Sequence, residues 1–346
     1  MKSILLSPFS LLYGAIVKTR RMLYEKRFFA SFESGVKTIS VGNITVGGTG
    51  KTPLVAMISE TLLNEGEKVC ILTRGYGRDN PKERVLVADG QRILADAREA
   101  GDEPFELAQK LSGKAVIVAD ANRAEAGKWA LAEFGVTVFI LDDGFQHLRL
   151  RRDLDLVLLD ATNPFGNGKM LPAGVLRESV HSLKHADAVI ITRTNLAADV
   201  SAIKTKVVEI NPDCRIFASR NEFTDPIKLK GFLSEKKTYP KAKIQNLKAT
   251  AFCALGNPDN FFAQLKQEGF SLTASQSFPD HHIYTQSEIK NLEKKAVESG
   301  AEILLTTAKD AVKLTHLKFN LPCFVMENEL KFDNVEEFER LILDNE

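Results

Sequence analysis

The feature that most constrains the fold is a glycine-rich turn at residues 40–52, SVGNITVGGTGKT, which follows an apolar run and precedes a helical pattern. This order predicts a phosphate-binding loop, because backbone N–H groups at the start of a helix converge on phosphate oxygens. Lys51 would reach the β- and γ-phosphates of a nucleotide, and Thr52 would ligate Mg²⁺. Thr45 stands where the strict pattern has glycine. We expect the nucleotide to be bound by Thr45, Val46, Gly47, Gly48, Thr49, Gly50, Lys51 and Thr52.

Short apolar runs alternate with helical patterns over the first two thirds of the chain. The alternation predicts a doubly wound, mostly parallel α/β sheet like that of P-loop NTPases. A Lys-rich stretch at 228–248 then indicates a junction, and a smaller α/β unit is expected beyond it. We expect an N-terminal segment at 1–30, a nucleotide-binding domain at 31–215 and a second domain at 216–346. The strand-like runs are 36–41, 69–72, 115–119, 136–141, 154–159, 188–192, 249–255, 303–307 and 323–326, and the helical patterns include 53–64, 123–134, 260–268 and 335–343.

The N-terminal segment carries six basic residues against one acidic residue, although the whole chain has a net charge of only +1. The low net charge gives no reason to expect a nucleic-acid partner, and no obligate protein partner is evident. The apolar stretch at 4–17 is shorter than the roughly 20 residues that cross a bilayer. We expect an interfacial helix on a membrane surface. A signal peptide and an ordinary core helix with a basic face are the alternatives.

A second acidic element follows the strand-like run 136–141. Asp142, at the end of that run, is the expected carboxylate on the metal side of the phosphate loop. The alternative is a solvated turn. Asp143, Gln146 and His147 are weaker candidates for the same site.

Three further polar clusters follow predicted strands and should line the same edge of the sheet. Arginines at this edge would bind nucleotide or substrate phosphate, unless they merely solubilise the surface. Asp102 would act on the incoming hydroxyl, or it would only cap a helix. The clusters contain Arg74 and Arg78, then Asp102 and Glu103, and then Asn122 and Arg123.

Residues 278–284, FPDHHIY, concentrate two histidines and an aspartate in a predicted loop of the second unit. A histidine titrates near neutral pH, so this loop can assist proton transfer. Metal binding is the alternative, although Mg²⁺ prefers oxygen ligands.

Together these motifs resemble the tetraacyldisaccharide 4'-kinase family. The similarity covers VGNITVGGTGKTP, TRGYGR, GDEP, ADANR, LDDGFQH, LPAGVLRE, FPDHH and TTAKDAVKL, from about residue 36 to residue 314. The resemblance implies transfer of the ATP γ-phosphate to the 4'-hydroxyl of tetraacyldisaccharide 1-phosphate in lipid A biosynthesis. It also implies a peripheral or monotopic enzyme on the cytoplasmic face of the bacterial inner membrane.

By the same resemblance, Asp102 is the catalytic base and His281 its partner, with the second domain closing over the cleft. Lys51, Thr52 and Asp142 would hold ATP and Mg²⁺, and Arg177 joins the candidates for the substrate phosphate. Ala308 stands where the family is expected to carry an acidic residue, which leaves the roles of Lys309 and Asp310 open.

Two other functions fit part of the pattern. A P-loop GTPase would need a guanine-binding Asn-Lys-x-Asp sequence, which the chain lacks. A membrane-bound ATP-binding adaptor would keep Lys51 and Thr52 but have no use for Asp102 or His281.

Overall fold

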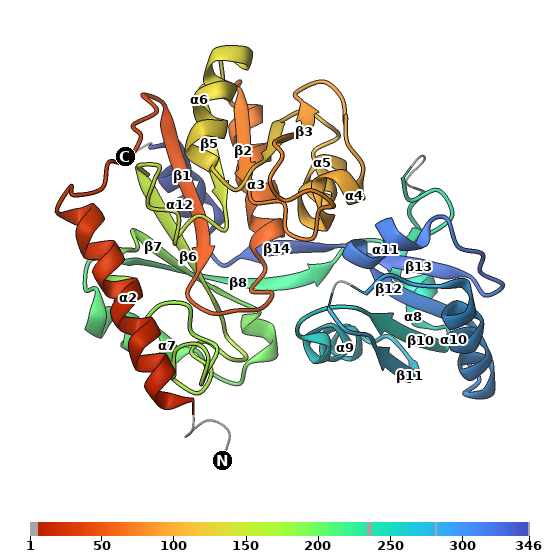
Figure 1. The fold of residues 1–346 in the computed structure, drawn as a ribbon. Coiled ribbons are helices and arrows are strands. Elements are labelled where there is room, and N and C mark those ends of the chain that lie inside the picture. The colour runs from red at the N-terminus through yellow and green to blue at the C-terminus, as the bar shows by residue number, and fades with distance from the viewer. Residues whose placement is uncertain (1–5, 234–236, 281, 345–346) are drawn as a thin grey trace. The chain divides into compact units, whose positions relative to one another are not determined.

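The computed structural model describes residues 6–233, 237–280 and 282–344. The chain divides into two compact units (Figure 1). The first unit combines Met1–Arg220 with Leu330–Glu346, and the second consists of Asn221–Glu329. The chain therefore returns to its first unit at the end, whereas the sequence prediction placed all of 216–346 in the second.

Aromatic packing explains why the C-terminal residues belong to the first unit. Strand β14 (Asn328–Phe332) lies beside β8 (Arg215–Phe223) in the sheet of that unit. The Phe332 ring stacks on Phe338 of helix α12 (Val335–Leu343), with 4.3 Å between centroids, and Phe338 is 1% exposed. Phe338 also meets the ring of Phe217 at 5.3 Å. Burial of these rings is a long-range effect that the local sequence pattern does not encode.

A nine-stranded sheet forms the centre of the first unit, in the order β14-β8-β7-β6-β1-β5-β2-β4-β3. The strands from β8 to β4 in this order are parallel, and β3 is antiparallel to β4 at one edge. All six strand-like runs predicted between residues 36 and 192 are strands of this sheet, which confirms the predicted fold class. The strands not yet given are β1 (Lys37–Asn43), β2 (Val69–Thr73), β3 (Val85–Asp89), β4 (Val116–Ala119), β5 (Val138–Asp142), β6 (Leu154–Asp160) and β7 (Ala188–Thr192).

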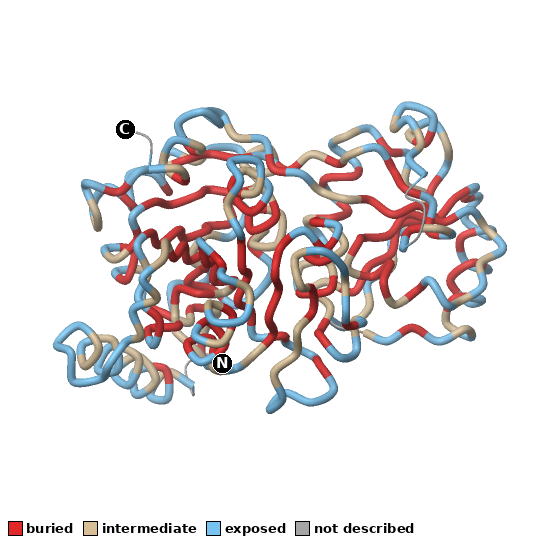
Figure 2. Tube along the Cα trace, turned by 90° about the horizontal axis from the view of Figure 1, so that it is seen from above, coloured by how far each residue is buried: buried red, intermediate tan, exposed pale blue. Residues whose placement is uncertain are grey.

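Helices pack on this sheet, and the buried segments of the chain gather in the interior of the unit (Figure 2). Every residue of β2, β5, β6 and β7 is buried, as expected when both faces of a parallel sheet are covered. Helix α3 contacts β1, β2 and β5, whereas α6 packs on β2 and β4. The helices of this unit, besides α12 and the N-terminal helix, are α3 (Lys51–Asn64), α4 (Ala97–Ala100), α5 (Asp102–Lys110), α6 (Arg123–Phe134) and α7 (Ser201–Ile210), with 3₁₀ turns η1 (Val180–His185) and η2 (Thr194–Leu196).

The second unit has its own sheet, in the order β11-β10-β12-β13-β9, with only β9 antiparallel to its neighbour. The predicted runs at 249–255, 303–307 and 323–326 are its strands β10, β12 and β13. The elements of this unit are β9 (Ile227–Lys228), α8 (Lys241–Gln245), β10 (Ala249–Cys253), α9 (Pro258–Gln267), β11 (Leu272–Ser277), α10 (Gln286–Glu298), β12 (Ile303–Thr307), α11 (Ala308–Leu314) and β13 (Cys323–Met326).

The N-terminal helix α2 (Ser7–Glu25) presents most of its apolar side chains to solvent. Phe9, Leu11, Leu12 and Ile16 are each between 59% and 77% exposed. Ser10 is the only buried residue of this helix, so the alternative of an ordinary core helix is wrong. Within the described ranges, no helix has the length and hydropathy needed to cross a bilayer.

Candidate active site

The phosphate loop occupies the turn between β1 and α3. Gly50 precedes the first residue of α3 with φ of +89°, a left-handed conformation that favours glycine. No side chain caps the start of α3 among the described residues, so its N–H groups are available to a phosphate. The helix dipole adds attraction for an anion at this end. The local geometry therefore suits the predicted nucleotide phosphates.

The segment 170–177 supports this loop through backbone contacts. The N–H of Val46 donates to the carbonyl of Val175 at 2.8 Å, and the N–H of Arg177 donates to Ile44 at 2.7 Å. Thr45 forms an isolated bridge with Leu176 in the same pairing. Residue 45 is therefore in extended backbone, which does not require glycine. This explains why threonine is tolerated at a position where the strict pattern has glycine.

Lys51 lies beside a fixed carboxylate. Its Nζ is 3.5 Å from Asp143 Oδ1, and Arg177 donates to both oxygens of Asp143 at 2.8 Å. Burial alone would raise the pKa of Asp143, but the Arg177 hydrogen bonds and the charge of Lys51 hold it well below its usual range. Asp143 is therefore ionised at neutral pH and positions Lys51.

Asp142 ends β5 in a different environment. Its side chain accepts a hydrogen bond from Thr73 Oγ1 at 3.0 Å, and the residue is only 3% exposed, so the alternative of a solvated turn is wrong. Burial, followed by the negative charge of Glu103, raises the pKa of Asp142 to about 7. A cation beside Asp142 would stabilise the ionised form of this buried carboxylate and lower its pKa again.

The oxygen donors at this edge fit Mg²⁺. Mg²⁺ commonly takes one or two carboxylates and completes its shell with phosphate oxygens and water. Asp142 could supply the carboxylate, and Thr52, in the first turn of α3, could supply a hydroxyl. Among the described residues no three His, Cys, Asp or Glu side chains form a metal cluster.

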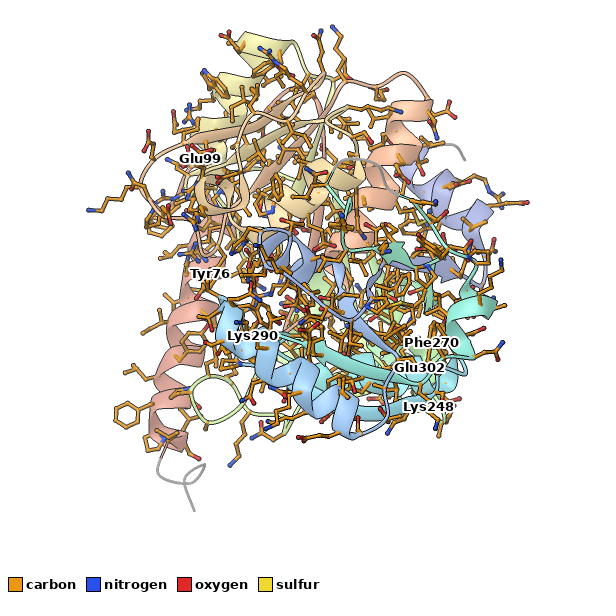
Figure 3. The ribbon with its side chains drawn as sticks, turned by 90° about the vertical axis from the view of Figure 1, so that its right-hand side faces the viewer. Tyr76, Glu99, Lys248, Phe270, Lys290 and Glu302 are labelled. Carbon is orange, nitrogen blue, oxygen red and sulfur yellow. The ribbon has the colours of Figure 1, made fainter. Side chains whose placement is uncertain are left out.

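Asp102 is the first residue of α5, next to the loop that follows β2. A Cβ on Gly101 would lie 2.6 Å from the carbonyl oxygen of Tyr76, so only glycine permits this backbone approach. Tyr76, whose side chain is labelled in Figure 3, is exposed. The N-cap of α5 is Gly101 and Asp102 is half-buried inside the first turn, so the N-cap alternative for Asp102 is wrong.

The candidate arginines differ in how far the protein already satisfies them. Arg78 is buried and donates to the carbonyl oxygens of Ala119 and Pro81, which makes it a support of the loop. Arg123 is 8% exposed, and its Nε and Nη1 have no partner among the described residues. Arg74 is exposed. Two buried N–H groups on Arg123 are thus available to an acceptor on a ligand.

The remaining candidates differ in whether the protein satisfies their polar atoms. They are Asn122, Gln146 and His147. Gln146 donates to the carbonyl of Asn43 at 2.9 Å, whereas Asn122 Oδ1 is buried without a partner among the described residues. Burial, and then the charge of Arg123, lowers the pKa of His147 to about 3. The imidazole of His147 is therefore neutral at physiological pH, with its buried Nε2 unpartnered among the described residues.

In the second unit, His281 lies outside the described residues. Its neighbour Asp280 forms an ion pair with Lys309 at 3.0 Å. Asp310 is fully buried and accepts hydrogen bonds from Thr307 Oγ1 at 2.7 Å and from the Tyr284 hydroxyl at 2.9 Å. Lys309 and Asp310 thus hold Asp280 and Tyr284 from within the second unit, whereas the N-cap of α11 is Thr307.

Comparisons with known proteins agree with this site. A family model described as tetraacyldisaccharide-1-P 4'-kinase matches residues 2–345. The chain belongs to the tetraacyldisaccharide 4'-kinase family. The 4'-kinase of Pelobacter propionicus is 40% identical over 91% of this chain and 84% of its own length. The 4'-kinase of Geobacter metallireducens is 40% identical over 90% of this chain and 88% of its own length.

A solved structure of a tetraacyldisaccharide 4'-kinase relative extends the agreement to the fold. The crystal structure described as an "apo" form of LpxK from Aquifex aeolicus in complex with ATP is 32% identical to this chain, covers 99% of both chains and has a TM-score of 0.77. The family resemblance predicted from the motifs is therefore confirmed.

Sequence analysis missed three supporting residues of this tetraacyldisaccharide 4'-kinase family member. Thr73 bonds Asp142, Thr192 Oγ1 donates to the carbonyl of Thr49 at 3.0 Å, and Glu178 binds Arg21 of α2 at 3.0 Å. Thr73 and Thr192 are each the last, polar residue of a buried strand, and that position was the available signal. The sequence gives no comparable signal for the contact between Glu178 and Arg21, because the two residues lie 157 positions apart.

Proposed function

We propose that this chain transfers the γ-phosphate of ATP to the 4'-hydroxyl of tetraacyldisaccharide 1-phosphate, a lipid A precursor. It is a phosphotransferase with an alcohol acceptor. The observation that carries the proposal is the phosphate loop with Lys51 fixed beside Asp143, in a chain matched along its length to 4'-kinases.

The ATP phosphates would bind at the start of α3, where helix N–H groups and the Lys51 ammonium neutralise their charge. Mg²⁺, held by Asp142 and Thr52, would supply further charge neutralisation on the β- and γ-phosphates. Asp143 and Arg177 position Lys51, so that its charge is fixed before the nucleotide binds. Transfer of a phosphoryl group depends mostly on such positioning.

Asp102 is proposed as the general base. As the 4'-oxygen forms its bond to the γ-phosphorus, the bond from that phosphorus to the β,γ-bridging oxygen breaks, ADP leaves and the hydroxyl proton passes to the carboxylate of Asp102. A carboxylate with an ordinary pKa of about 4 is a weak base toward an alcohol, so a histidine partner is chemically useful. The proposed partner, His281, rests on the FPDHH motif alone.

Arg123, Asn122 and His147 are proposed to bind the polar part of the lipid substrate, because each has a buried polar atom with no partner among the described residues. Arg74, Glu103 and Gln146 are further candidates from the same edge. Arg78 and Arg177 are instead proposed to act indirectly. Arg78 holds the carbonyl of Ala119, and Arg177 holds the carboxylate of Asp143.

We place the enzyme peripherally on the cytoplasmic face of the inner membrane. The exposed apolar side chains of α2 would enter the interface, and its lysines and arginines would meet anionic head groups. ATP is available on the cytoplasmic side, which fixes the face.

The test is transfer of labelled γ-phosphate from ATP to tetraacyldisaccharide 1-phosphate in mixed micelles. We expect Asp102→Ala and His281→Ala each to lower kcat by at least about 100-fold, in the range for loss of general-base catalysis, while nucleotide binding remains. Asp79→Ala is the matched control, because Asp79 is an exposed aspartate in the same unit. ATP hydrolysis without lipid labelling would favour a P-loop NTPase, and ATP binding with neither hydrolysis nor transfer would favour an adaptor. Full transfer by Asp102→Ala would refute Asp102 as the general base.

A further inference from the structure

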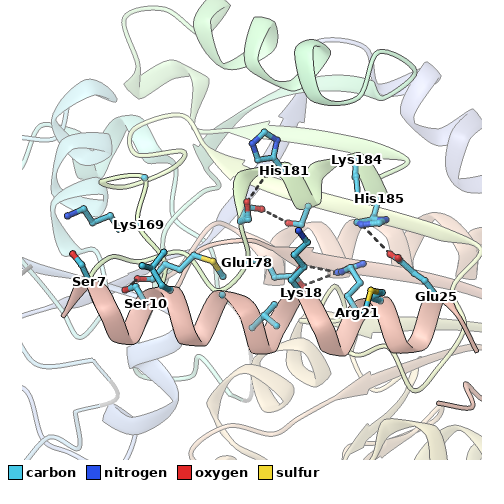
Figure 4. Close-up of a pocket in the computed structure, with 18 residues that line it drawn as sticks. Ser7, Ser10, Lys18, Arg21, Glu25, Lys169, Glu178, His181, Lys184 and His185 are labelled. Atoms are coloured by element: carbon cyan, nitrogen blue, oxygen red, sulfur yellow. Dashed lines mark hydrogen bonds and ion pairs between the residues drawn. The ribbon is translucent and has the colours of Figure 1, made fainter. Parts of the chain in front are cut away.

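A cavity of about 1000 Å³ lies between α2 and the segment 168–185 of the first unit (Figure 4). None of the residues assigned above to ATP, the metal or the base lines it. It is therefore a separate candidate for ligand binding. The charged side chains that line it are Lys18, Arg21, Glu25, Lys169, Glu178, Lys184 and the histidines 181 and 185.

The helix is fixed at both ends of this cavity. Near its start, Ser10 Oγ donates to the carbonyl of Met170 at 2.7 Å and accepts from the N–H of Ala173 at 3.0 Å. Farther along, Arg21 donates to both carboxylate oxygens of Glu178 at 3.0 Å. These buried and half-buried contacts hold α2 at a set distance from the segment 168–185, so the cavity is a built feature of the fold.

The cavity has a surplus of positive charge. Arg21 is neutralised by Glu178, and Glu25 Oε1 lies 3.4 Å from His185 Nε2. Lys18 and Lys184 have no ion-pair partner among the described residues, and Lys18 extends from α2 toward the segment that carries Glu178 and His181 (Figure 4). Lys18 on α2 and Lys184 on η1 thus add two charges without an ion-pair partner to the lining of the cavity, which favours an anionic ligand.

The surroundings of these lysines are apolar. Leu11, Val17 and Met170 line the cavity itself. Phe9 and Leu12 are 61% and 62% exposed on the same helix. A ligand that suits both features has an anionic head and hydrocarbon chains.

We propose that this cavity binds the phosphate head group of an anionic membrane phospholipid, with Lys18 and Lys184 at the phosphate. The inference rests on the proposed membrane association of α2 and adds a defined lipid site to it. Bound lipid would hold the first unit at the surface in one orientation, because α2 is tied to the segment 168–177 that supports the phosphate loop.

The experiment compares binding of the full chain to vesicles of phosphatidylcholine and to vesicles of an equal mixture with phosphatidylglycerol. We expect wild type to bind the mixed vesicles more tightly. The double variant Lys18→Glu/Lys184→Glu should lose about tenfold in affinity for mixed vesicles, as expected for charges close to an anionic surface. It should bind pure phosphatidylcholine as wild type does.

Two variants separate the cavity from general surface charge. The double variant Lys26→Glu/Arg27→Glu makes the same charge change just beyond the end of α2 and outside the cavity, so it should lose much less. Gly14→Leu changes no charge but places a side chain against Met170, whose Sδ would be 3.0 Å from the new Cβ. It should lower the preference for phosphatidylglycerol. Circular dichroism checks that each variant is folded.

The outcomes are distinct. Equal losses in Lys26→Glu/Arg27→Glu and in Lys18→Glu/Lys184→Glu, or an unchanged Gly14→Leu, would overturn the cavity as the lipid site while leaving membrane association intact. A rise in KM for the lipid substrate in neutral detergent micelles, caused by Lys18→Glu/Lys184→Glu, would assign the cavity to the substrate phosphate instead. Absence of wild-type binding to both vesicles would overturn membrane association and the inference together.

Discussion

At the scale of single residues, Asp142 and Asp143 are neighbours whose surroundings move their pKa values in opposite directions. Burial raises the pKa of Asp142 to about 7, whereas at Asp143 the Arg177 hydrogen bonds and the charges of Lys51, Arg177 and Arg123 together outweigh burial and lower the pKa. One carboxylate is thus ready to respond to a cation, and the other is permanently charged and holds Lys51. Adjacent residues of one type therefore carry separate tasks.

Asp143→Asn keeps the shape of the side chain but removes the charge that holds Lys51 and Arg177. We expect kcat/KM for ATP to fall by about 100-fold, similar to the loss of one preorganised electrostatic contact in other active sites. Steady-state kinetics with varied ATP measure this. Asp155→Asn is the matched control, because Asp155 also pairs with an arginine, Arg152, at 2.8 Å, but at the start of a strand. Equal losses in both variants would contradict the assignment.

His147 gives a prediction for the pH dependence of stability. Its pKa falls from an ordinary 6.5 to about 3 in the folded chain, so between these pH values the unfolded chain binds more protons. The free energy of unfolding should therefore decrease on acidification below the unfolded pKa, by up to about 1.4 kcal/mol per pH unit. His147→Gln should lessen this decrease in urea unfolding, and His316→Gln, at an exposed site, should not. Identical slopes in wild type and His147→Gln would refute the argument.

At the scale of elements, the start of α5 and the loop after β2 approach each other closely through their backbones. Gly101 has φ of +93° and lies against the Tyr76 carbonyl. This contact sets the position of Asp102 relative to the edge of the sheet. The geometry of the proposed base thus depends on a residue that has no side chain.

Gly101→Ala should lower the free energy of unfolding by about 2–4 kcal/mol, because strain in the backbone adds to a clash at 2.6 Å. Gly135→Ala is the control, since its φ is also positive, at +57°, but no atom lies within 4 Å of the added Cβ. That change should cost about 1 kcal/mol. Denaturant unfolding compares the two, and equal costs would show that the close approach is unimportant.

Sequence analysis predicted the buried parallel strands well because each is a short, continuously apolar run. It did not predict β3, β8 or β14, and β8 shows why: the exposed residues Arg215 and Arg220 interrupt its apolar pattern. The position of the phosphate loop before α3 and of Asp142 at the end of β5 was predictable, because each follows a continuous apolar run. The strand-end positions of Thr73 and Thr192 could be read from the sequence, but their hydrogen-bond partners could not, because these depend on which strands are neighbours.

At the scale of the whole molecule, the second unit is an insertion between two parts of the first. Helix α12 contacts α3, and Lys37 of β1 bonds the carbonyl of Ile342. The last described elements of the chain therefore stabilise the helix that begins at the phosphate loop.

Phe338→Ala should destabilise the first unit by about 3–5 kcal/mol, the usual cost of removing a buried aromatic ring. Hydrogen exchange followed by mass spectrometry should show the added exchange in β1, α3 and β8. Phe261→Ala, in the core of the second unit, is the matched control and should add exchange in β10 and α9. Increased exchange confined to 221–329 in Phe338→Ala would contradict the assignment of α12.

The insertion also sets the order of events during synthesis on the ribosome. Residues 51–64 are made before the inserted unit, whereas α12, which packs on them, is made after it. The inserted unit is contiguous in sequence, so it can mature first, although domains more often fold from the N-terminus. The nucleotide-binding unit therefore completes its core only after the whole inserted unit has been synthesised.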